Sequence, residues 1–188
     1  MMGEDIHQKT FAKSKKTGKW IDAASIDFDA EPEVFKHLVP FRNYKLFSLF
    51  GSRRADWKEL DASGYGIPEE VKKDLPELAD FHENNFGDWY GYVWFTRKKL
   101  VEEIDKYIDC LSSPEKYYAD FDEDIRAEQL ADLEEFGVAL EDWLSDATTL
   151  KEMLLEIKEK LKDQEQYFED YKDIIDFDDV IYVFWFDN

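Results

Sequence analysis

Residues 180–187, Val180-Ile181-Tyr182-Val183-Phe184-Trp185-Phe186-Asp187, form a run of β-branched and aromatic side chains that ends at an aspartate. Residues of these types favour β-strands. The run is too apolar to remain as a solvated tail, and its length is typical of a buried strand. We therefore expect a buried central strand at this point of the chain.

The other end of the chain predicts a β-hairpin. Residues 4–12 and 18–26 have strand character, and the polar link 13–19 between them contains Gly18, as turns often do. The simplest arrangement pairs this hairpin with the run 180–187, so that both ends of the chain lie in one sheet. The predicted fold class is α+β. It consists of a small antiparallel sheet formed by the N-terminal hairpin and the C-terminal strand, covered by helices.

Apolar residues at spacings of three and four predict helices between these strands. Thr96 and Ser113 are expected N-caps, Gly51 is an expected C-terminal stop, and Pro68 is expected to open a helix. We expect residues 80–95 to form a loop rich in Gly and aromatic residues, with some extended structure. The expected helical segments are 41–50, a short turn within 53–61, a segment after Pro68, one after Thr96, one after Ser113, one near 126–144 and a long one over 147–172.

Negative charge is concentrated in the second half of the chain. The 188 residues carry a net charge of −21. Residues 1–100 hold 17 acidic and 16 basic side chains, a net of −1, whereas residues 101–188 hold 28 and 8, a net of −20. The chain length fits a single domain over 1–188. We expect the acidic stretch 112–175 to be a helical elaboration within that domain, with its last two helices packed as an antiparallel hairpin.

The composition limits the compartment and the chemistry. The single cysteine, Cys110, excludes an internal disulfide and lies at an apolar position of an expected helix, so we expect it to be a core residue. The first residues lack a basic start followed by an apolar run, and no stretch approaches 18 apolar residues. The expected location is therefore the cytoplasm, with no membrane partner. No glycine-rich phosphate loop or nucleophile elbow is present, so we expect no cofactor and no nucleophilic catalysis.

Four short strings lie in order along the whole chain: Gly3-Glu4-Asp5-Ile6-His7, Arg42-Asn43-Tyr44-Lys45-Leu46-Phe47, Gly66-Ile67-Pro68-Glu69-Glu70-Val71 and Val183-Phe184-Trp185-Phe186-Asp187-Asn188. Together they resemble a family of uncharacterised proteins common in bacteriophage and prophage genomes. The resemblance implies a phage context, in the cytoplasm of a host cell, but brings no known activity. The acidic stretch 112–175 has no counterpart in that family.

One departure from the family pattern concerns metal binding. The family has a His-Ser-His-Ser-Trp-Leu-Thr string where this chain has Tyr90-Gly91-Tyr92-Val93-Trp94-Phe95-Thr96. The tryptophan and threonine remain, but both histidines are tyrosines. If the family binds a metal at that string, the resemblance implies that this chain binds it poorly or not at all.

A second metal hypothesis rests on the two ends of the chain. Asp5 and His7 lie two residues apart on an expected strand, so their side chains share one face. Asp187 can approach them from the C-terminal strand, and His82 can join from the loop. Such a His/Asp cluster suits a metal or acid–base chemistry, as in a metal-dependent hydrolase. The alternative is a polar network that pins the strand ends.

A basic and aromatic group of residues indicates a possible small nucleotide ligand. Guanidinium groups with aromatic rings suit a phosphate and a base. Under this hypothesis the protein sequesters a nucleotide signal; the alternative is that Arg42 pairs with a structural carboxylate. The candidate ligand-binding residues are Arg42, Asn43, Tyr44, Arg53, Arg54, Trp89 and Trp94.

The acidic helices give the hypothesis that ranks first. A carboxylate-rich face repels nucleic acid and anionic membranes but attracts basic surfaces, and its charge spacing can imitate a DNA backbone. We therefore expect a phage-encoded, non-catalytic antagonist of a bacterial defence system, for example an anti-CRISPR protein. It would bind the basic surface of a host nucleic-acid-binding or defence protein and not nucleic acid itself. The alternative is that the acidic helices are only a solvated surface that keeps the protein soluble. The candidate partner-binding residues are Asp120, Asp122, Glu123, Asp124, Asp132, Glu134, Glu135, Glu141, Asp142 and Asp146.

Overall fold

A computed structural model describes residues 5–23, 38–39, 44–51, 57–78, 89–135 and 137–187. It contains one five-stranded antiparallel sheet with the strand order β2-β1-β5-β4-β3. The strands are β1 (Asp5–Ser14), β2 (Trp20–Asp22), β3 (Gly64–Tyr65), β4 (Trp89–Thr96) and β5 (Ile175–Asp187). The predicted α+β class and the pairing of the two chain ends are confirmed.

The central strand β5 is buried on both faces of the sheet. Tyr182, Phe184 and Phe186 belong to the larger core cluster. The alternate residues Val183 and Trp185 belong to a second cluster. Side chains alternate between the faces of a strand, so the two clusters lie on opposite sides of β5. Every side chain from 180 to 186 is buried. This burial on both faces explains why the run that predicted the strand is apolar at every position and does not alternate with polar residues.

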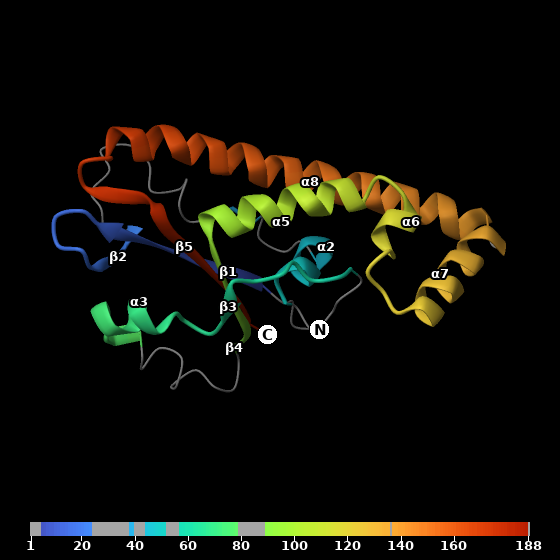
Figure 1. Cartoon of the computed structure of the whole chain (residues 1–188), viewed down its shortest axis with the longest axis horizontal. Coiled ribbons are helices and arrows are strands. Elements are labelled where there is room, and N and C mark those ends of the chain that lie inside the picture. The colour runs from blue at the N-terminus through green and yellow to red at the C-terminus, as the bar shows by residue number, and fades with distance from the viewer. Residues whose placement is uncertain are drawn as a thin grey trace.

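Helices cover both faces of the sheet (Figure 1). The long helix α8 and helix α5 run side by side over the larger cluster, whereas α3 lies on the opposite side, where its Val71 joins the second cluster. Helices α6 and α7 lie at the end of the molecule remote from β2. The helices are α2 (Tyr44–Phe47), followed by the 3₁₀ helix η2 (Ser48–Phe50), α3 (Glu69–Asp74), α5 (Arg97–Cys110), α6 (Pro114–Tyr117), α7 (Glu123–Glu135) and α8 (Gly137–Asp170).

Local capping chemistry explains the helix ends that the sequence predicted. Thr96 Oγ1 accepts a hydrogen bond of 3.2 Å from the Lys99 amide at the start of α5, and Ser113 Oγ accepts one of 3.4 Å from the Lys116 amide at the start of α6. Gly51 ends η2 with φ of 90°, a left-handed conformation that favours glycine. These predictions are confirmed because a cap depends on residues next to each other in the chain.

The predicted boundary between the last two helices is wrong. Helix α7 ends at Glu135 and α8 begins at Gly137, so Leu140 and Trp143 belong to α8 and not to the preceding helix. Leu133 of α7 and Trp143 of α8 both contact the same core cluster, so the apolar spacing continues across the break. Periodicity therefore could not locate the boundary.

The expected helical turn within 53–61 is not found in its described part, residues 57–61, which are irregular. Their backbone groups bond to other elements: the Lys58 amide donates to the Tyr117 hydroxyl at 2.7 Å, and the Leu60 amide donates to the Leu49 carbonyl at 2.9 Å. Tertiary partners thus replace the bonds that a helix would need.

The extended structure expected within the loop 80–95 is the strand β4, which begins at Trp89, and residues 80–88 lie outside the described residues. Across the described ranges, no helix is both long enough and apolar enough to cross a bilayer.

Candidate binding surface

The carboxylates predicted to bind a partner lie on α7, on the turn before it and on the first turns of α8. Helix α7 has no buried side chain. Of the ten predicted residues, nine are exposed and Asp146 is half-buried. Residues 120–146 hold eleven acidic side chains and one basic one, Arg126. We call the ten predicted carboxylates together the acidic surface.

Most carboxylates of the acidic surface form no ion pair within the described chain. Within the described ranges, Asp120 pairs with Lys58 at 3.5 Å and Asp146 pairs with Lys45. The other eight carboxylates form no ion pair with a described residue. Elsewhere some acidic side chains have cationic partners, as Glu165 has in Arg97 at 2.7 Å, whereas others, such as the exposed Glu70 and Glu156, form no ion pair with a described residue. The acidic surface therefore projects an uncompensated negative field.

An aromatic groove adjoins the N-terminal end of α7. It has a volume of about 400 Å³. The rings pack edge to face, with 5.2 Å between the centroids of Trp57 and Tyr117 and 5.3 Å between those of Tyr118 and Phe121. Ile125 of α7 is 44% exposed at the groove. The groove is lined by Trp57, Lys58, Tyr117, Tyr118, Phe121, Ile125 and Gln129.

The sequence did not predict this groove. Phe121, Ile125 and Gln129 follow a spacing of four, which places them along one face of α7 and its approach. Trp57, however, comes from a segment about 60 residues earlier, and nothing in the local sequence links the two. Only the high aromatic content, 16%, indicated that surfaces of this kind were available.

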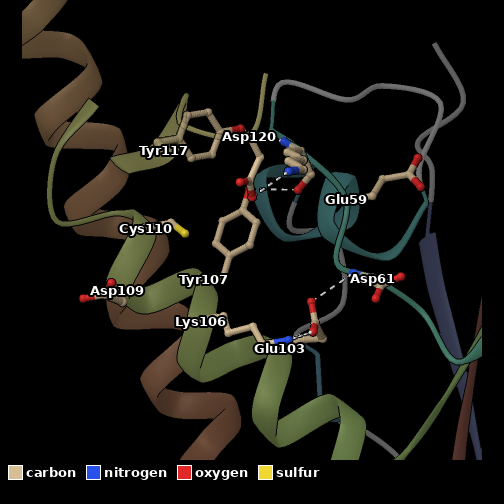
Figure 2. Close-up of a pocket in the computed structure, with 10 residues that line it drawn as sticks. Glu59, Asp61, Glu103, Lys106, Tyr107, Asp109, Cys110, Tyr117 and Asp120 are labelled. Atoms are coloured by element: carbon tan, nitrogen blue, oxygen red, sulfur yellow. Dashed lines mark hydrogen bonds and ion pairs between the residues drawn. The ribbon is translucent and has the colours of Figure 1, made fainter. Parts of the chain in front are cut away.

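A second hollow, of about 430 Å³, is lined by residues of the segment 57–61 and of helix α5, together with Tyr117 and Asp120 (Figure 2). It shares Lys58 and Tyr117 with the aromatic groove. The Tyr107 hydroxyl donates to the Lys58 carbonyl at 2.8 Å, and the Tyr117 hydroxyl accepts from the Lys58 amide at 2.7 Å. Burial raises the pKa of both phenols. The two hydroxyls are therefore neutral hydrogen-bonding groups that hold this segment in place.

A buried carboxylate, Glu103, lies in the same hollow (Figure 2). It is 8% exposed and receives bonds from Lys106 at 2.7 Å, from Lys99 at 3.3 Å and from the Asp61 amide at 3.3 Å. Burial acts to raise the pKa of Glu103, but the hydrogen bonds from the two lysines and the amide outweigh it, and the pKa is lowered. Glu103 is thus a fixed anion that ties α5 to the segment 57–61.

The Cys110 thiol also lines the second hollow. It is half-buried, and not a core residue as expected. Burial raises the pKa of Cys110, and the nearby carboxylates of Asp120 and Asp109 raise it further. A protonated thiol is a poor nucleophile. No histidine lines the described part of this hollow.

The residues predicted to bind a metal are only partly described. Asp5 and Asp187 are opposite each other in the β1–β5 register, and His7 is opposite Trp185. The His7 ring stacks on the Trp185 ring, with 5.4 Å between centroids and 16° between planes. His82 lies outside the described residues. No three His, Cys, Asp or Glu side chains of the described ranges are grouped as metal ligands.

Of the residues predicted to bind a nucleotide, Tyr44, Trp89 and Trp94 lie within the described ranges, and a shared site for them stays a prediction. Helix α2, which Tyr44 begins, packs on the larger core cluster through Phe47. Trp94 packs against the second cluster on the other face of the sheet. Its indole covers Gly64, where an added Cβ would lie 2.6 Å from Trp94 Nε1. Trp89 begins β4. The remaining candidates, which are Arg42, Asn43, Arg53 and Arg54, lie outside the described residues.

No protein-family model, no curated protein and no solved structure matches this chain.

Proposed function

We propose that this protein is a non-catalytic binding protein whose acidic surface occupies a basic, nucleic-acid-binding surface of another protein. One observation carries the proposal: residues 120–146 hold eleven acidic side chains and one basic one, and eight of the ten carboxylates of the acidic surface form no ion pair with a described residue. Unpaired carboxylates on a projecting helix retain their attraction for a basic partner.

The density of charge on α7 supports this proposal. The helix has 13 residues, six of them acidic. At 1.5 Å per residue it is about 20 Å long, so it carries one carboxylate per about 3 Å of axis. One strand of duplex DNA carries a phosphate every 3.4 Å or so. A protein groove that binds one DNA strand therefore meets a similar linear charge density on α7.

The resemblance to phage proteins suggests the biological setting. In that setting the partner is a nucleic-acid-binding component of a bacterial defence system, such as a CRISPR nuclease, and this protein blocks it by taking the place of nucleic acid. The carboxylates repel nucleic acid itself, so the proposed complex contains protein partners only.

A pull-down from bacterial lysate tests the proposal. The bait is the wild-type protein, compared with a variant that carries Asp132→Lys, Glu134→Lys, Glu135→Lys and Asp142→Lys. We expect the wild type to retain a nucleic-acid-binding protein at low salt, and to lose it on the addition of salt because screening weakens charge-led complexes. The four-lysine variant is expected to retain none.

A control variant separates the position of the charges from the net charge. It carries four lysines at exposed acidic positions away from α7, so its net charge changes by the same amount. We expect this control to retain the same partner as the wild type. Retention of the partner by both variants would contradict the proposal. The control positions are Glu70, Glu77, Glu156 and Glu159.

A further inference from the structure

We infer that the aromatic groove receives an apolar side chain of the partner, within a segment whose flanking residues are Lys or Arg. This inference rests on the proposed function and specifies the chemistry of the partner. In this arrangement the groove binds the apolar side chain, and the acidic surface forms ion pairs with the Lys or Arg residues that flank it.

The groove has the size and lining of a site for an apolar side chain. Its volume of about 400 Å³ lies within the range of small-molecule and side-chain pockets. Four aromatic rings and Ile125 form most of its wall. Pockets of this kind receive the few anchor residues that dominate the affinity of a protein interface. A polyanionic helix alone would need no such pocket beside it.

The rim of the groove is negatively charged. Glu128 follows Ile125 by three residues and Asp132 follows Gln129 by three, so each carboxylate is a neighbour of a groove residue on the helix. Asp120 and Asp122 flank Phe121 in sequence. All four carboxylates are exposed. An apolar segment without positive charge would meet this rim unfavourably, whereas Lys and Arg beside the anchor would pair with it.

Lys58 shows that the rim binds an ammonium group. Its Nζ lies 5.6 Å from the centroid of the Phe121 ring and 3.5 Å from Asp120 Oδ2. A ring face and a carboxylate together are the contacts that a cation receives in cation–π sites. The Lys58 and Asp120 side chains are 44% and 80% exposed, and exposed pairs contribute only about 0–1 kcal/mol. A partner's Lys or Arg can therefore displace Lys58 and take over its contacts.

Two synthetic peptides test the inference by fluorescence anisotropy. Each has fifteen residues, with Lys and Arg alternating with Ser and Gly. The anchored peptide has Leu at its centre, and the anchor-free peptide has Ser there. At low salt we expect the wild-type protein to bind the anchored peptide about tenfold more tightly, as burial of one apolar side chain implies.

A pair of matched variants identifies the groove as the cause. Ile125 and Leu155 are both 44% exposed on helices, but only Ile125 lines the groove. We expect Ile125→Ser to reduce the preference for the anchored peptide to less than about threefold, and Leu155→Ser to leave it unchanged. Circular dichroism of both variants establishes that they are folded.

The outcomes distinguish this inference from the proposed function. If the wild type binds both peptides equally and the four-lysine variant binds neither, the acidic surface binds without the groove, and the inference that the groove receives an apolar side chain is wrong. An equal loss of preference in Ile125→Ser and Leu155→Ser would also overturn the groove assignment. If no peptide binds the wild type at low salt, or if the four-lysine variant binds as well as the wild type, the proposed function fails and the anchor with it.

Discussion

The Tyr182 hydroxyl on the central strand donates a hydrogen bond of 2.6 Å to Gln164 Oε1 on the long helix, and both side chains are fully buried. Among the described side chains of α8, Gln164 is the one polar residue in the buried stripe that includes Leu150, Leu154, Ile157 and Leu161. Its partner in the middle of β5 explains this interruption. The bond fixes the position of α8 along the strand, and so it also fixes the end of α8 that carries part of the acidic surface.

Replacement of Tyr182 by Phe is expected to lower the free energy of unfolding by about 1–3 kcal/mol, because the buried Gln164 amide loses a partner. Urea denaturation followed by circular dichroism measures this loss. The control is Tyr65→Phe, which removes a hydroxyl from a side chain that is 77% exposed and is expected to have no measurable effect. Equal midpoints for Tyr182→Phe and wild type would show that the bond does not stabilise the fold.

Acid is expected to destabilise the protein partly through Glu103. The pKa of this carboxyl is lowered on folding from its ordinary value of 4.5. A lowered pKa stabilises the folded state above the unfolded pKa, and this stabilisation disappears as the pH falls through the folded pKa. We expect Glu103→Gln to cost about 1–2 kcal/mol at pH 7, and the difference from wild type to shrink below about pH 4.5.

Unfolding of Glu103→Gln and wild type at a series of pH values measures this dependence. Glu102→Gln on the same helix is the control, because the Glu102 side chain is 51% exposed and exposed pairs contribute little. If the difference in unfolding free energy between Glu103→Gln and wild type grew as the pH fell, its pH dependence would have the wrong sign, and this result would contradict a lowered pKa for Glu103.

Helix α7 is expected to exchange its amide hydrogens much faster than α5. The two helices have 13 and 14 residues, but α7 buries no side chain whereas α5 buries Leu100, Glu103, Ile104 and Tyr107. Few buried contacts allow local opening at low cost. Hydrogen–deuterium exchange with mass spectrometry is expected to give α7 rates at least about tenfold higher. Similar protection of both helices would show that α7 is held by more than its described contacts.

Replacement of Lys58 by Gln is expected to strengthen binding of the anchored peptide. The substitution removes the internal ammonium group from Asp120 and the Phe121 ring, so the peptide no longer competes with it. Exposed ion pairs of this kind contribute about 0–1 kcal/mol, which corresponds to an increase in affinity of up to about fivefold. Lys98→Gln, at an 85% exposed side chain on α5, is the control. Weaker binding of the anchored peptide to Lys58→Gln than to Lys98→Gln would mean that Lys58 helps to form the peptide site and does not compete with the peptide for Asp120 and Phe121.

Much of the fold could be predicted because its signals are local. The strand β5 is apolar at every position from 180 to 186, and the Thr96 and Ser113 caps act within three residues of themselves. The two-residue strand β3 has no such signal, since it is defined only by pairing of Gly64 and Tyr65 with β4. The segment 57–61 likewise takes its shape from tyrosines about 50 to 60 residues later.

The candidate site divides in the same way. The positions of the acidic surface could be predicted, because charge is a property of composition and the residues 120–146 carry only one basic side chain. The aromatic groove could not, because Trp57 meets Phe121 and Ile125 only in the folded chain. The absence of ion pairs from eight carboxylates could not be predicted either, since it depends on where the lysines of the described chain lie.

Displacement of nucleic acid from the captured partner tests the central claim most directly. The partner is loaded with fluorescent duplex DNA at low salt, and the release of DNA is followed as this protein is added. The account predicts that the wild type and the control with lysines at positions 70, 77, 156 and 159 release the DNA, and that the variant with lysines at 132, 134, 135 and 142 does not. Release of DNA by the latter variant at wild-type concentrations would contradict the account.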